Sequence, residues 1–578
     1  MSVTINRRPT VSSNTQLHDN PLINRVLLAR GVESQRELNF ALADLPRWQG
    51  MPGIDAAVER LLQALKEQQH ILIVGDYDCD GATSTTLALL VFRAMGFEHV
   101  RYLVPNRFDY GYGLTPAIVD VACENKPDLI FTVDNGIASV DGVAHARECN
   151  IDVIVTDHHL PPSVLPDAEA LVNPNLVDSA FPSKNLAGVG VCFYVLLALR
   201  ARLAKEQLPG GNVKLAEYLD LVAIGTVADV VPLDKINRTL VEQGLRRIRA
   251  RATRPGVLAL LALAGREVER ASIFDIGFGI GPRLNAAGRL DDMSRGIQCL
   301  SSDNAVDSQN VAAELDGLNK QRRVIEKKMR EQASDILQDD LVGDGNDDER
   351  FGVVLFNEDW HQGVIGIVAG RIKDELHKPA VVFSADGETH LKGSARSIPG
   401  VHIRDVLDAI ATANPGMINK FGGHAMAAGM TIERTRFAGF ADAFNDQIKQ
   451  VVSGVLPSRQ WLTDGSLNDS ERSLHNAQLL ADVCPWGQDF PQPIFDDHFV
   501  LESSRVVGNA HLKLRLRSVP DAHEPKAAGG VFDAIAFNQP DSFVTDEVVQ
   551  VVYSVTVNLY RGRESLQLNV LHIQKSDG

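Results

Sequence analysis

The sequence predicts an α/β protein that ends in a small antiparallel β-barrel. From Ile71, short apolar runs alternate with helix-like segments, a pattern typical of a parallel sheet with helices on its faces. A second, smaller α/β unit follows a long charged helix. From about residue 455 the segments turn strand-like, and an OB-fold would accommodate them.

The chain has 578 residues, which is enough for three or four domains. An acidic loop over 341–350 marks a boundary, because a polar run without periodicity does not continue a helix or strand. We expect five parts: an N-terminal helical segment over 1–50, a catalytic domain over 51–300, a connecting helix over 301–340, a second α/β domain over 351–450, and a barrel over 455–578.

Composition excludes several classes of protein. The net charge is -17, so any nucleic-acid site must be locally basic on an acidic body. None of the six cysteines forms a CxxC pair, which argues against a zinc ribbon and suits a reducing cytosol. The N-terminus lacks the apolar core of a signal peptide, and the longest apolar run, 186–199, is too short to span a bilayer. We expect a soluble cytoplasmic protein without a membrane partner.

The first domain shows the strand–helix alternation most clearly. Helix-like segments at Ala82–Met95 and Thr115–Asn125 lie between strand-like runs. In such folds ligands bind beyond the carboxyl ends of the strands. The strand-like runs are ILIVG, VRYLVP, LIFTV, DVIVT and EALVN.

Acids and histidines follow three of these runs. The stretch VGDYDCDGATS places three aspartates at every second position, where like charges would repel unless a cation binds them. Carboxylates with imidazoles and no thiolate favour Mg²⁺ or Mn²⁺, and the set is large enough for two ions about 4 Å apart. We therefore expect metal-assisted hydrolysis of a phosphoester. The residues are Asp76, Asp78 and Asp80 after the first run, Asp134 after the third, and Asp157, His158 and His159 after the fourth.

Later segments add further polar groups. A helical segment, KLAEYLDLVAIGTVADVV, ends near Asp229, and the glycine-rich GIGPRLNAAGRL carries Arg283 and Arg289. In the second unit, LKGSARS and FGGHAMAAG combine small residues with basic or polar groups, which suggests backbone close to a phosphate. AHLKLRLR alternates leucines with cations, and 548–574 reads as a hairpin turning at Arg561-Gly562-Arg563.

Together these motifs resemble those of the DHH phosphoesterase superfamily. GDYDCDGATS, VPNRFDYGYGL, TVDNG, the Asp157-His158-His159 triplet and GTVADVVPL look like its catalytic domain, and GSARS with FGGHAMAAG looks like the DHHA1 domain. GPRLNAAGRL and the C-terminal barrel narrow the resemblance to the RecJ family of single-strand-specific DNA exonucleases. The resemblance covers nearly all of the chain beyond residue 50.

The resemblance implies roles for individual residues. It makes Asp78, Asp80, Asp134, His158 and Asp229 metal ligands, with Asp76 beside them. Many relatives carry a histidine four residues before the first metal aspartate, but this chain has Val74 there, so Asp76 could substitute as a ligand. Asp157 would orient its neighbours, and His159 would face the scissile phosphate.

The resemblance also implies contacts to phosphate. Guanidinium forks match phosphate oxygens, and Gly422-Gly423 lets backbone approach closely. Without the resemblance, Arg107 and Arg396 could equally form ordinary ion pairs. Trp360, His361 and Gly363 could line the same groove, although Trp360 suits a core position equally well. The implied contacts are Arg107, Arg283, Ser394, Arg396 and His424.

The function implied is a 5′→3′ exonuclease that releases 5′-mononucleotides from single-stranded DNA with two Mn²⁺ or Mg²⁺ ions, in DNA repair and recombination. A groove too narrow for duplex would hold the 5′ end, the barrel would hold the trailing strand, and a single-strand-binding protein and a helicase would be partners. One alternative is a related enzyme for short oligonucleotides, cyclic dinucleotides or pyrophosphate, against which the barrel argues. Another is a non-catalytic DNA-binding scaffold, against which the near-complete acid set argues.

Overall fold

The computed structural model describes residues 3–9, 11, 15–106, 110–344, 350–508, 510–519, 529–539 and 545–575, with the side chains of 339–344 excepted. The chain divides into two compact units. Unit 1 comprises Met1–Thr4, Arg289–Asp291 and Glu314–Arg459, and unit 2 comprises Ile5–Gly288, Asp292–Ala313 and Gln460–Gly578.

A five-stranded parallel sheet forms the first part of unit 2. Its strand order, β3-β2-β4-β5-β6, confirms the predicted alternation of strands and helices. The chain leaves β2 in one direction to form β3 and then crosses to the other side for β4, so the strand order reverses at β2 and β4, where such folds bind ligands. The strands are β2 (Ile71–Gly75), β3 (Val100–Leu103), β4 (Leu129–Val133), β5 (Asp152–Thr156) and β6 (Ala170–Val172).

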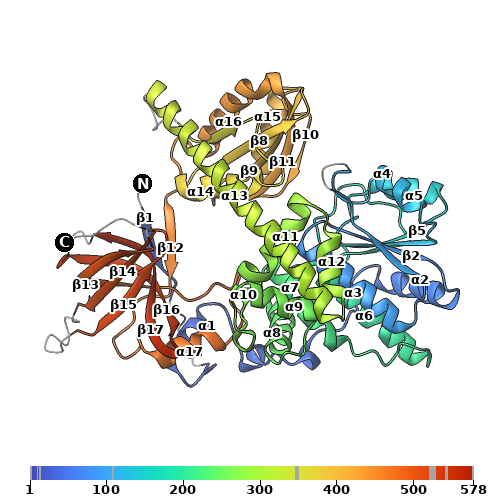
Figure 1. Ribbon diagram of the computed structural model, residues 1–578, viewed down its shortest axis with the longest axis horizontal. Coiled ribbons are helices and arrows are strands. Elements are labelled where there is room, and N and C mark those ends of the chain that lie inside the picture. Colours follow the sequence, from blue (N-terminus) through green and yellow to red (C-terminus); the bar gives the residue numbers. More distant parts are fainter. Residues whose placement is uncertain are drawn as a thin grey trace. The chain divides into compact units, whose positions relative to one another are not determined.

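Helices cover both faces of this sheet (Figure 1). One face is covered by α2 (Ile54–Lys66), α3 (Cys79–Met95) and α6 (Gly188–Lys205), and the other by α4 (Pro116–Cys123) and α5 (Val140–Glu148). The strands are therefore buried on both sides, which explains why their sequences are apolar throughout rather than alternating.

A group of helices follows the sheet. Helix α7 is apolar on every side and is almost entirely buried, as expected for a helix with neighbours all round. It ends at Asp229, as the sequence predicted. The group consists of α7 (Leu219–Ala228), α8 (Lys235–Arg249), α9 (Pro255–Leu263), α10 (Ile273–Asp275), the π-helical turn η5 (Ile276–Ile280), α11 (Gly281–Leu290) and α12 (Ser294–Ser301).

The long helix α13 (Ala305–Asp344) leads from unit 2 into the mixed sheet of unit 1. That sheet has the order β10-β11-β9-β8-β7, with only β7 and β8 parallel. One face packs on α13 and α14, and the other on α15 and α16. The remaining elements are β7 (Val353–Phe356), α14 (Ile365–Leu376), β8 (Ala380–Asp386), β9 (His390–Arg396), α15 (Ile403–Ala413), β10 (Lys420–Gly423), β11 (Ala427–Glu433) and α16 (Phe437–Val451).

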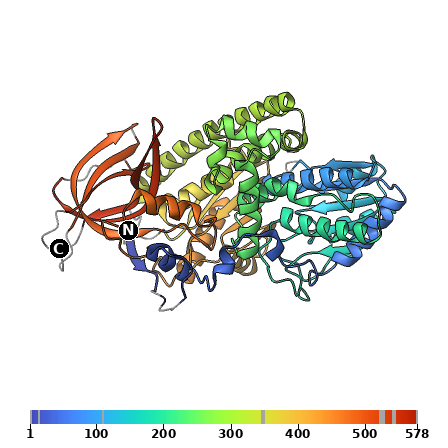
Figure 2. The ribbon, with the colours of Figure 1, turned by 90° about the horizontal axis from the view of Figure 1, so that it is seen from below.

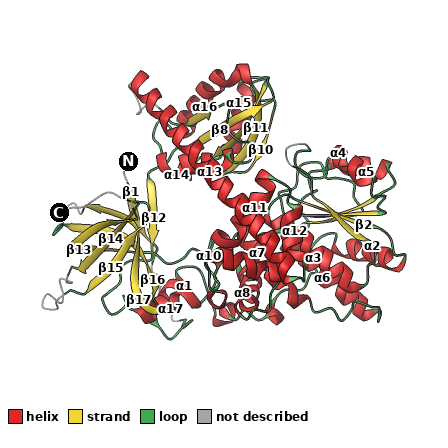
Figure 3. Ribbon diagram, in the orientation of Figure 1, coloured by secondary structure: helices red, strands yellow, loops and turns green. Residues whose placement is uncertain are grey.

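The C-terminal part of unit 2 is a closed five-stranded barrel, as predicted (Figure 3). Along β14 the three leucines are buried and the cations lie on the other face, so the alternation read from AHLKLRLR is confirmed. Strands β16 and β17 form the predicted hairpin. The order is β13-β14-β15-β17-β16, with β13 (Phe495–Val507), β14 (His511–Ser518), β15 (Val531–Ala536), β16 (Val548–Tyr560) and β17 (Arg563–Lys575).

The N-terminal segment packs beside the barrel, as the blue and orange-red parts of Figure 2 show. Arg7 forms an ion pair with Asp496 of β13, at 2.8 Å, and Arg30 forms a buried one with Asp464, at 2.6 Å. These contacts give the segment a structural role that the sequence did not reveal. It contains β1 (Val3–Arg7), which pairs with β12 (Arg459–Thr463), and α1 (Pro21–Leu28), η1 (Gln35–Leu38) and η2 (Leu42–Asp44), and it lies near α17 (Leu474–Asp482).

Within the described ranges, every helix is too short or too polar to cross a membrane.

Candidate metal centre

The acids and histidines singled out in the sequence meet at the carboxyl edge of the parallel sheet. Most of them lie in the loops after β2, β4 and β5; Asp80 lies in the first turn of α3, and Asp229 caps the C-terminus of α7. Three overlapping groups form, in each of which the potential ligand atoms lie within 4.8 Å of one another. The groups are Asp76, Asp78 and Asp134; Asp80, His158 and Asp229; and Asp134, His158 and His159.

Asp80 is fully buried and is held by the first turn of α6. Its two carboxylate oxygens accept hydrogen bonds from the backbone N–H groups of Gly188, at 2.6 Å, and Val189, at 3.0 Å. A helix N-terminus stabilises a carboxylate because its N–H groups have no partner within the helix. The start of α6 therefore fixes Asp80 from a point far along the chain.

Two glycines leave the space that the buried carboxylates occupy. A Cβ atom on Gly188 would lie 2.5 Å from Asp134 Oδ1, and one on Gly225 would lie 2.7 Å from Asp80 Oδ1. Any larger residue would displace the carboxylates. The sequence analysis missed both positions; the small residues in LAGVGVC and AIGTVAD were the available signal.

The backbone around the centre is also unusual. Asp78 caps α3 by accepting a hydrogen bond from Gly81 N at 3.0 Å. Asp134 and Val230 have positive φ angles of 62° and 61°. This conformation is strained for a β-branched residue such as Val230, which follows the ligand candidate Asp229 directly. Strain of this kind is concentrated at functional sites, where the surrounding structure enforces it.

Crowding and burial make the carboxylates resist ionisation. Burial, followed by the charges of Asp229 and Asp78, raises the pKa of Asp80 well above its usual value. Burial and the charges of Asp80 and Asp78 do the same for Asp134. Burial and Asp78 raise the pKa of Asp229 to about 7. A divalent cation would offset these charges, and oxygen ligands with one imidazole suit Mg²⁺ or Mn²⁺, so the residues present fit such an ion.

His158 lies between two of these carboxylates. Its Nε2 atom is 3.2 Å from Asp134 Oδ1 and 3.4 Å from Asp229 Oδ2. An imidazole nitrogen in this position can bind the same cation as the carboxylates. His158 is therefore placed where the resemblance expects a metal ligand.

Asp157 organises the loop after β5. Its Oδ1 accepts hydrogen bonds from His158 N at 2.7 Å, His159 N at 3.0 Å and His159 Nδ1 at 2.7 Å, and its Oδ2 accepts one from Ile137 N at 2.9 Å. Burial opposes its charge, but the hydrogen bond and charge of His159 lower the pKa of Asp157 overall. Burial likewise opposes charge on His159, but Asp157 raises the pKa of His159 to about 9. The two side chains form an ion pair at neutral pH.

Tyr112 is a further residue that the sequence analysis did not select. Its hydroxyl lies 3.3 Å from His159 Nε2 and donates a hydrogen bond to the Asp134 carbonyl at 3.3 Å. Its ring packs edge-on against Tyr77 and His159. It lies in the VPNRFDYGYGL motif, which was the available signal.

The predicted phosphate contacts fall in several places. Ser394 and Arg396 lie on β9 in unit 1, where Arg396 donates to Ser394 Oγ at 3.1 Å. Gly366, in the first turn of α14, is close to both: a Cβ atom there would lie 2.9 Å from Ser394 Oγ and 3.0 Å from Arg396 Nη2. Burial lowers the pKa of Arg396, and within the described ranges no carboxylate lies at ion-pair distance from it. His424 is in the turn between β10 and β11, next to the strand end that pairs with Arg396.

The other predicted contacts have different surroundings. Arg283 is buried in unit 2, and its guanidinium donates to the Gly279 carbonyl at 2.7 Å and the Leu263 carbonyl at 3.2 Å. Trp360 is a core residue of unit 1 whose Nε1 donates to Gln332 at 3.0 Å. His361 accepts a hydrogen bond from Gly363 N. Arg107 lies outside the described residues, and its contact stays a prediction.

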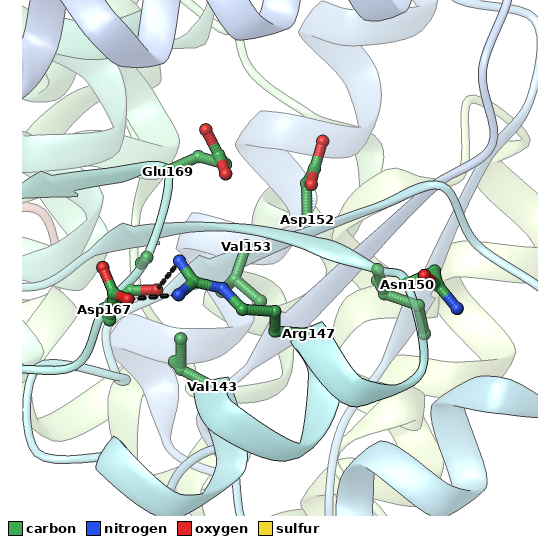
Figure 4. A pocket seen from close by; sticks show the side chains of 9 residues that line it. Val143, Arg147, Asn150, Asp152, Val153, Asp167 and Glu169 are labelled. Carbon is green, nitrogen blue, oxygen red and sulfur yellow. Dashed lines mark hydrogen bonds and ion pairs between the residues drawn. The ribbon is translucent and has the colours of Figure 1, made fainter.

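A pocket of about 280 Å³ lies elsewhere in the same domain (Figure 4). It opens beside Asp152, the first residue of β5, and therefore at the opposite end of that strand from Asp157. Figure 4 shows Arg147 reaching Asp167, and Asp152 forms an ion pair with Arg60 at 2.7 Å. Arg147, Asp152 and Asp167 thus have partners, and we do not expect this pocket to be a second metal centre.

Family models match three parts of the chain. The DHH family N-terminal domain matches residues 70–226, the DHHA1 domain residues 349–453, and the RecJ OB domain residues 463–572. The last match identifies the barrel as an OB domain.

Whole proteins and solved structures agree with these matches. The single-stranded-DNA-specific exonuclease RecJ of Salmonella typhimurium is 48% identical over 557 residues, which is 95% of each chain. That of Escherichia coli is 47% identical over 562 residues, 96% of each chain. The crystal structure of RecJ from Thermus thermophilus in complex with Mn²⁺ has a TM-score of 0.81 and 27% identity, and the match covers 100% of this chain and 80% of that one. With its three domains, its carboxylate–histidine centre and these relatives, the chain belongs to the RecJ family of single-stranded-DNA-specific exonucleases.

Proposed function

We propose that the protein is a metal-dependent exonuclease that degrades single-stranded DNA from its 5′ end and releases 5′-mononucleotides. The observation that carries the proposal is the buried set of carboxylates and imidazoles at the carboxyl edge of the parallel sheet, in a chain of this family. The substrate class is that of the related single-stranded-DNA-specific exonucleases, and we extend it to cleavage from the 5′ end and release of mononucleotides.

Two ions would be held by this set. Asp76, Asp78 and Asp134 form one group of ligands, and Asp80, His158 and Asp229 form another. Related structures contain Mn²⁺ or Mg²⁺, and the ligand types here suit either ion. Bound there, such ions supply a Lewis acid that generates a nucleophile from water and offsets charge on the phosphate.

The side chains around the ions have separate tasks in this proposal. Asp157 orients His159 through the bond to Nδ1, which points the rest of the imidazole away from Asp157 and toward substrate. The positively charged His159 would stabilise the charge that develops on the scissile phosphate. Tyr112 limits the rotation of the same ring.

Phosphate binding is the proposed task of Ser394, Arg396 and His424. Arg396 is a partly buried cation beside the first turn of α14, and backbone N–H groups at a helix N-terminus favour an anion. Arg107 and Arg283 would add contacts along the strand. The cationic face of β14, with Lys513, Arg515 and Arg517, would hold the trailing part of the strand. A single-strand-binding protein and a helicase remain proposed partners.

The test is a degradation assay. The purified protein is incubated with single-stranded and duplex DNA labelled at either end, in Mn²⁺, Mg²⁺ or EDTA, with a cyclic dinucleotide and a short oligoribonucleotide as further substrates. We expect metal-dependent loss of the single strand from its 5′ end, with duplex spared. Cleavage of the small substrates alone would point to another branch of the superfamily. Binding of single strands without cleavage in any metal would favour a non-catalytic scaffold.

An Arg396→Ala variant tests the phosphate site separately. We expect weaker binding of strands that carry a 5′-phosphate, with Mn²⁺ affinity unchanged, because Arg396 is not among the ligand groups. Fluorescence anisotropy with phosphorylated and unphosphorylated strands measures the first quantity, and calorimetric titration with Mn²⁺ the second. Equal binding of phosphorylated strands by variant and wild type would remove Arg396 from the site.

A further inference from the structure

Phe274 and Phe278 form an exposed aromatic pair in unit 2. Their rings lie 4.6 Å apart between centroids, at 32° to each other, yet their side chains are 54% and 64% exposed. Arg266 places its guanidinium 5.3 Å from the Phe274 ring. Two adjacent exposed phenylalanines cost solubility and contribute little to a core, so their exposure calls for a binding role.

The pair is held rigidly. A capping box between Ser272 and Asp275 fixes the start of α10, and Asp275 also forms an ion pair with Arg266 at 3.2 Å. Phe278 lies on η5, where a π-helical turn replaces regular helix. The buried residues Ile276 and Ile280 anchor this turn, so the exposed rings do not have to be ordered when a ligand arrives.

The same turn adjoins the metal centre. Residues of η5 and the start of α11 pack on the last turn of α7, which ends at Asp229: a Cβ atom on Gly277 would lie 3.8 Å from Val227 Cγ1, and one on Gly281 would lie 3.4 Å from Ala228 Cβ. Phe278 therefore lies on a turn that packs on the helix ending at the ligand candidate Asp229, and Phe274 lies on α10 directly before that turn.

On its other side the segment contacts the barrel. Arg270, four residues before Phe274, forms an ion pair with Glu564 of β17, and Gln478 donates to the same carboxylate at 2.7 Å. Glu564 follows the hairpin turn at Arg561-Gly562-Arg563, beside the exposed Tyr560. The pair thus lies on the segment that joins the metal centre to the basic hairpin of the barrel.

We propose that Phe274 and Phe278 are a base-stacking platform that holds single-stranded DNA between the metal centre and the barrel hairpin. Aromatic rings stack on any base without regard to sequence, and the guanidinium of Arg266, which pairs with Asp275, lies beside the Phe274 ring. A docked protein is a weaker explanation, because the relatives act on single-stranded DNA and the turn that carries Phe278 packs on the helix that ends at Asp229. This inference rests on the proposed function, since it assigns a further contact for the same substrate.

The test compares long and short substrates. In the double variant Phe274→Ala/Phe278→Ala we expect KM for a 20-nucleotide strand to rise about 5- to 100-fold, the range that loss of base stacking produces, with kcat unchanged. KM for a dinucleotide, which ends before the platform, should not change. Phe278→Trp should keep the wild-type KM, because an indole also stacks. Val177→Ala, at a fully exposed apolar residue, is the matched control.

A second measurement reports stacking directly. The base analogue 2-aminopurine loses fluorescence when it stacks, so wild-type protein in EDTA should quench it at internal positions of the strand and the double variant should not. Unchanged KM and quenching in the double variant would overturn the platform and leave the rings to a protein partner. An equal fall of kcat on both substrates would overturn it in favour of a structural effect on Asp229. Failure of wild type to cleave any single strand would instead contradict the proposed function.

Discussion

At the scale of single residues, the absence of a side chain at Gly188 and Gly225 leaves space for two buried carboxylates. A Cβ atom at either position would lie within 2.7 Å of a carboxylate oxygen. We expect Gly188→Ala to reduce hydrolysis about 100-fold or more and to weaken Mn²⁺ binding, because a Cβ atom 2.5 Å from Asp134 Oδ1 must turn that carboxylate away. Initial rates on single-stranded DNA and calorimetric titration with Mn²⁺ measure the two effects.

Gly317→Ala is the control for that variant. It makes the same substitution inside α13 at a point where a Cβ atom meets nothing within 4 Å. There the protein should gain up to about 1 kcal/mol of stability with unchanged activity, since alanine favours helix over glycine. Wild-type Mn²⁺ affinity in Gly188→Ala would show that the carboxylate adapts and that the glycine is not required.

The titration of the carboxylates makes stability depend on pH. Asp80, Asp134 and Asp229 have pKa values raised by folding, so the folded protein binds more protons than the unfolded chain above pH 4. Their contribution to stability therefore falls as pH rises, through about 7 for Asp229. Folding also raises the pKa of His159, from 6.5 to about 9, so its contribution to stability is likewise lost as pH rises through about 9. The Tm of metal-free protein should drop from pH 5 to pH 8.

Divalent metal should reduce or reverse the fall of Tm between pH 5 and pH 8. The reason is that ions bind the carboxylates more tightly as rising pH deprotonates them. Thermal unfolding across this pH range, in EDTA and in Mn²⁺, measures both slopes. Asp229→Asn should make the fall of Tm with pH in EDTA less steep, since the amide does not titrate while Asp80, Asp134 and His159 still do. A Tm in EDTA that rises steadily toward pH 8 would contradict the raised pKa values.

At the scale of elements, we expect the stability of the barrel to depend on the buried cation Arg472. Arg472, which precedes α17, is almost fully buried, donates to Tyr553 Oη at 2.9 Å and forms an ion pair with Asp497 at 2.9 Å. Its guanidinium also lies 5.0 Å from the Phe499 ring. Arg472→Leu should destabilise the protein by about 3–5 kcal/mol, because the largely buried Asp497 would lose the cation that pairs with it and keep two neutral hydrogen-bond donors.

Urea unfolding followed by circular dichroism measures that loss, with Arg505→Leu on the exposed face of β13 as the control. The double variant Arg472→Leu/Asp497→Leu should recover part of the stability, since it leaves no buried charge unpaired. If Arg472→Leu and Arg505→Leu cost the same, the buried network would have no special role.

At the scale of the whole molecule, a chain with net charge -17 must attract DNA through local basic surfaces. Binding of single strands should weaken as salt rises, with a slope in log Kd of about 0.7 for each phosphate contact. Arg515→Gln/Arg517→Gln, on the cationic face of β14, should lower that slope by about 1.4. Anisotropy titrations across a range of salt concentrations measure it. A slope equal to that of wild type would exclude this strand face from the DNA path.

The architecture and the clustering of the candidate ligands could be predicted from local patterns in the amino-acid sequence. Apolar runs with aspartates behind them predicted β2, β4 and β5 and the edge at which Asp80, Asp134 and His158 meet, because parallel strands bring their carboxyl ends together. Alternation predicted β14, and a long charged run with no proline and a single glycine, Gly317, predicted α13. These features are local, since they follow from periods of about 2 and 3.6 residues.

Only the tertiary structure decided which distant groups serve the same carboxylates. The N–H group of Gly188 donates to Asp80, which lies 108 residues earlier in the chain. A side chain at Gly225 would collide with the same carboxylate. Neither glycine belongs to a periodic pattern in the sequence. Phe274 and Phe278 are apolar residues whose exposure only the structure reveals, on α10 and on η5. The period of apolar residues predicts which face of a helix or strand is buried. Which residues contact that face depends on how the elements pack, and those contacts join residues far apart in the sequence.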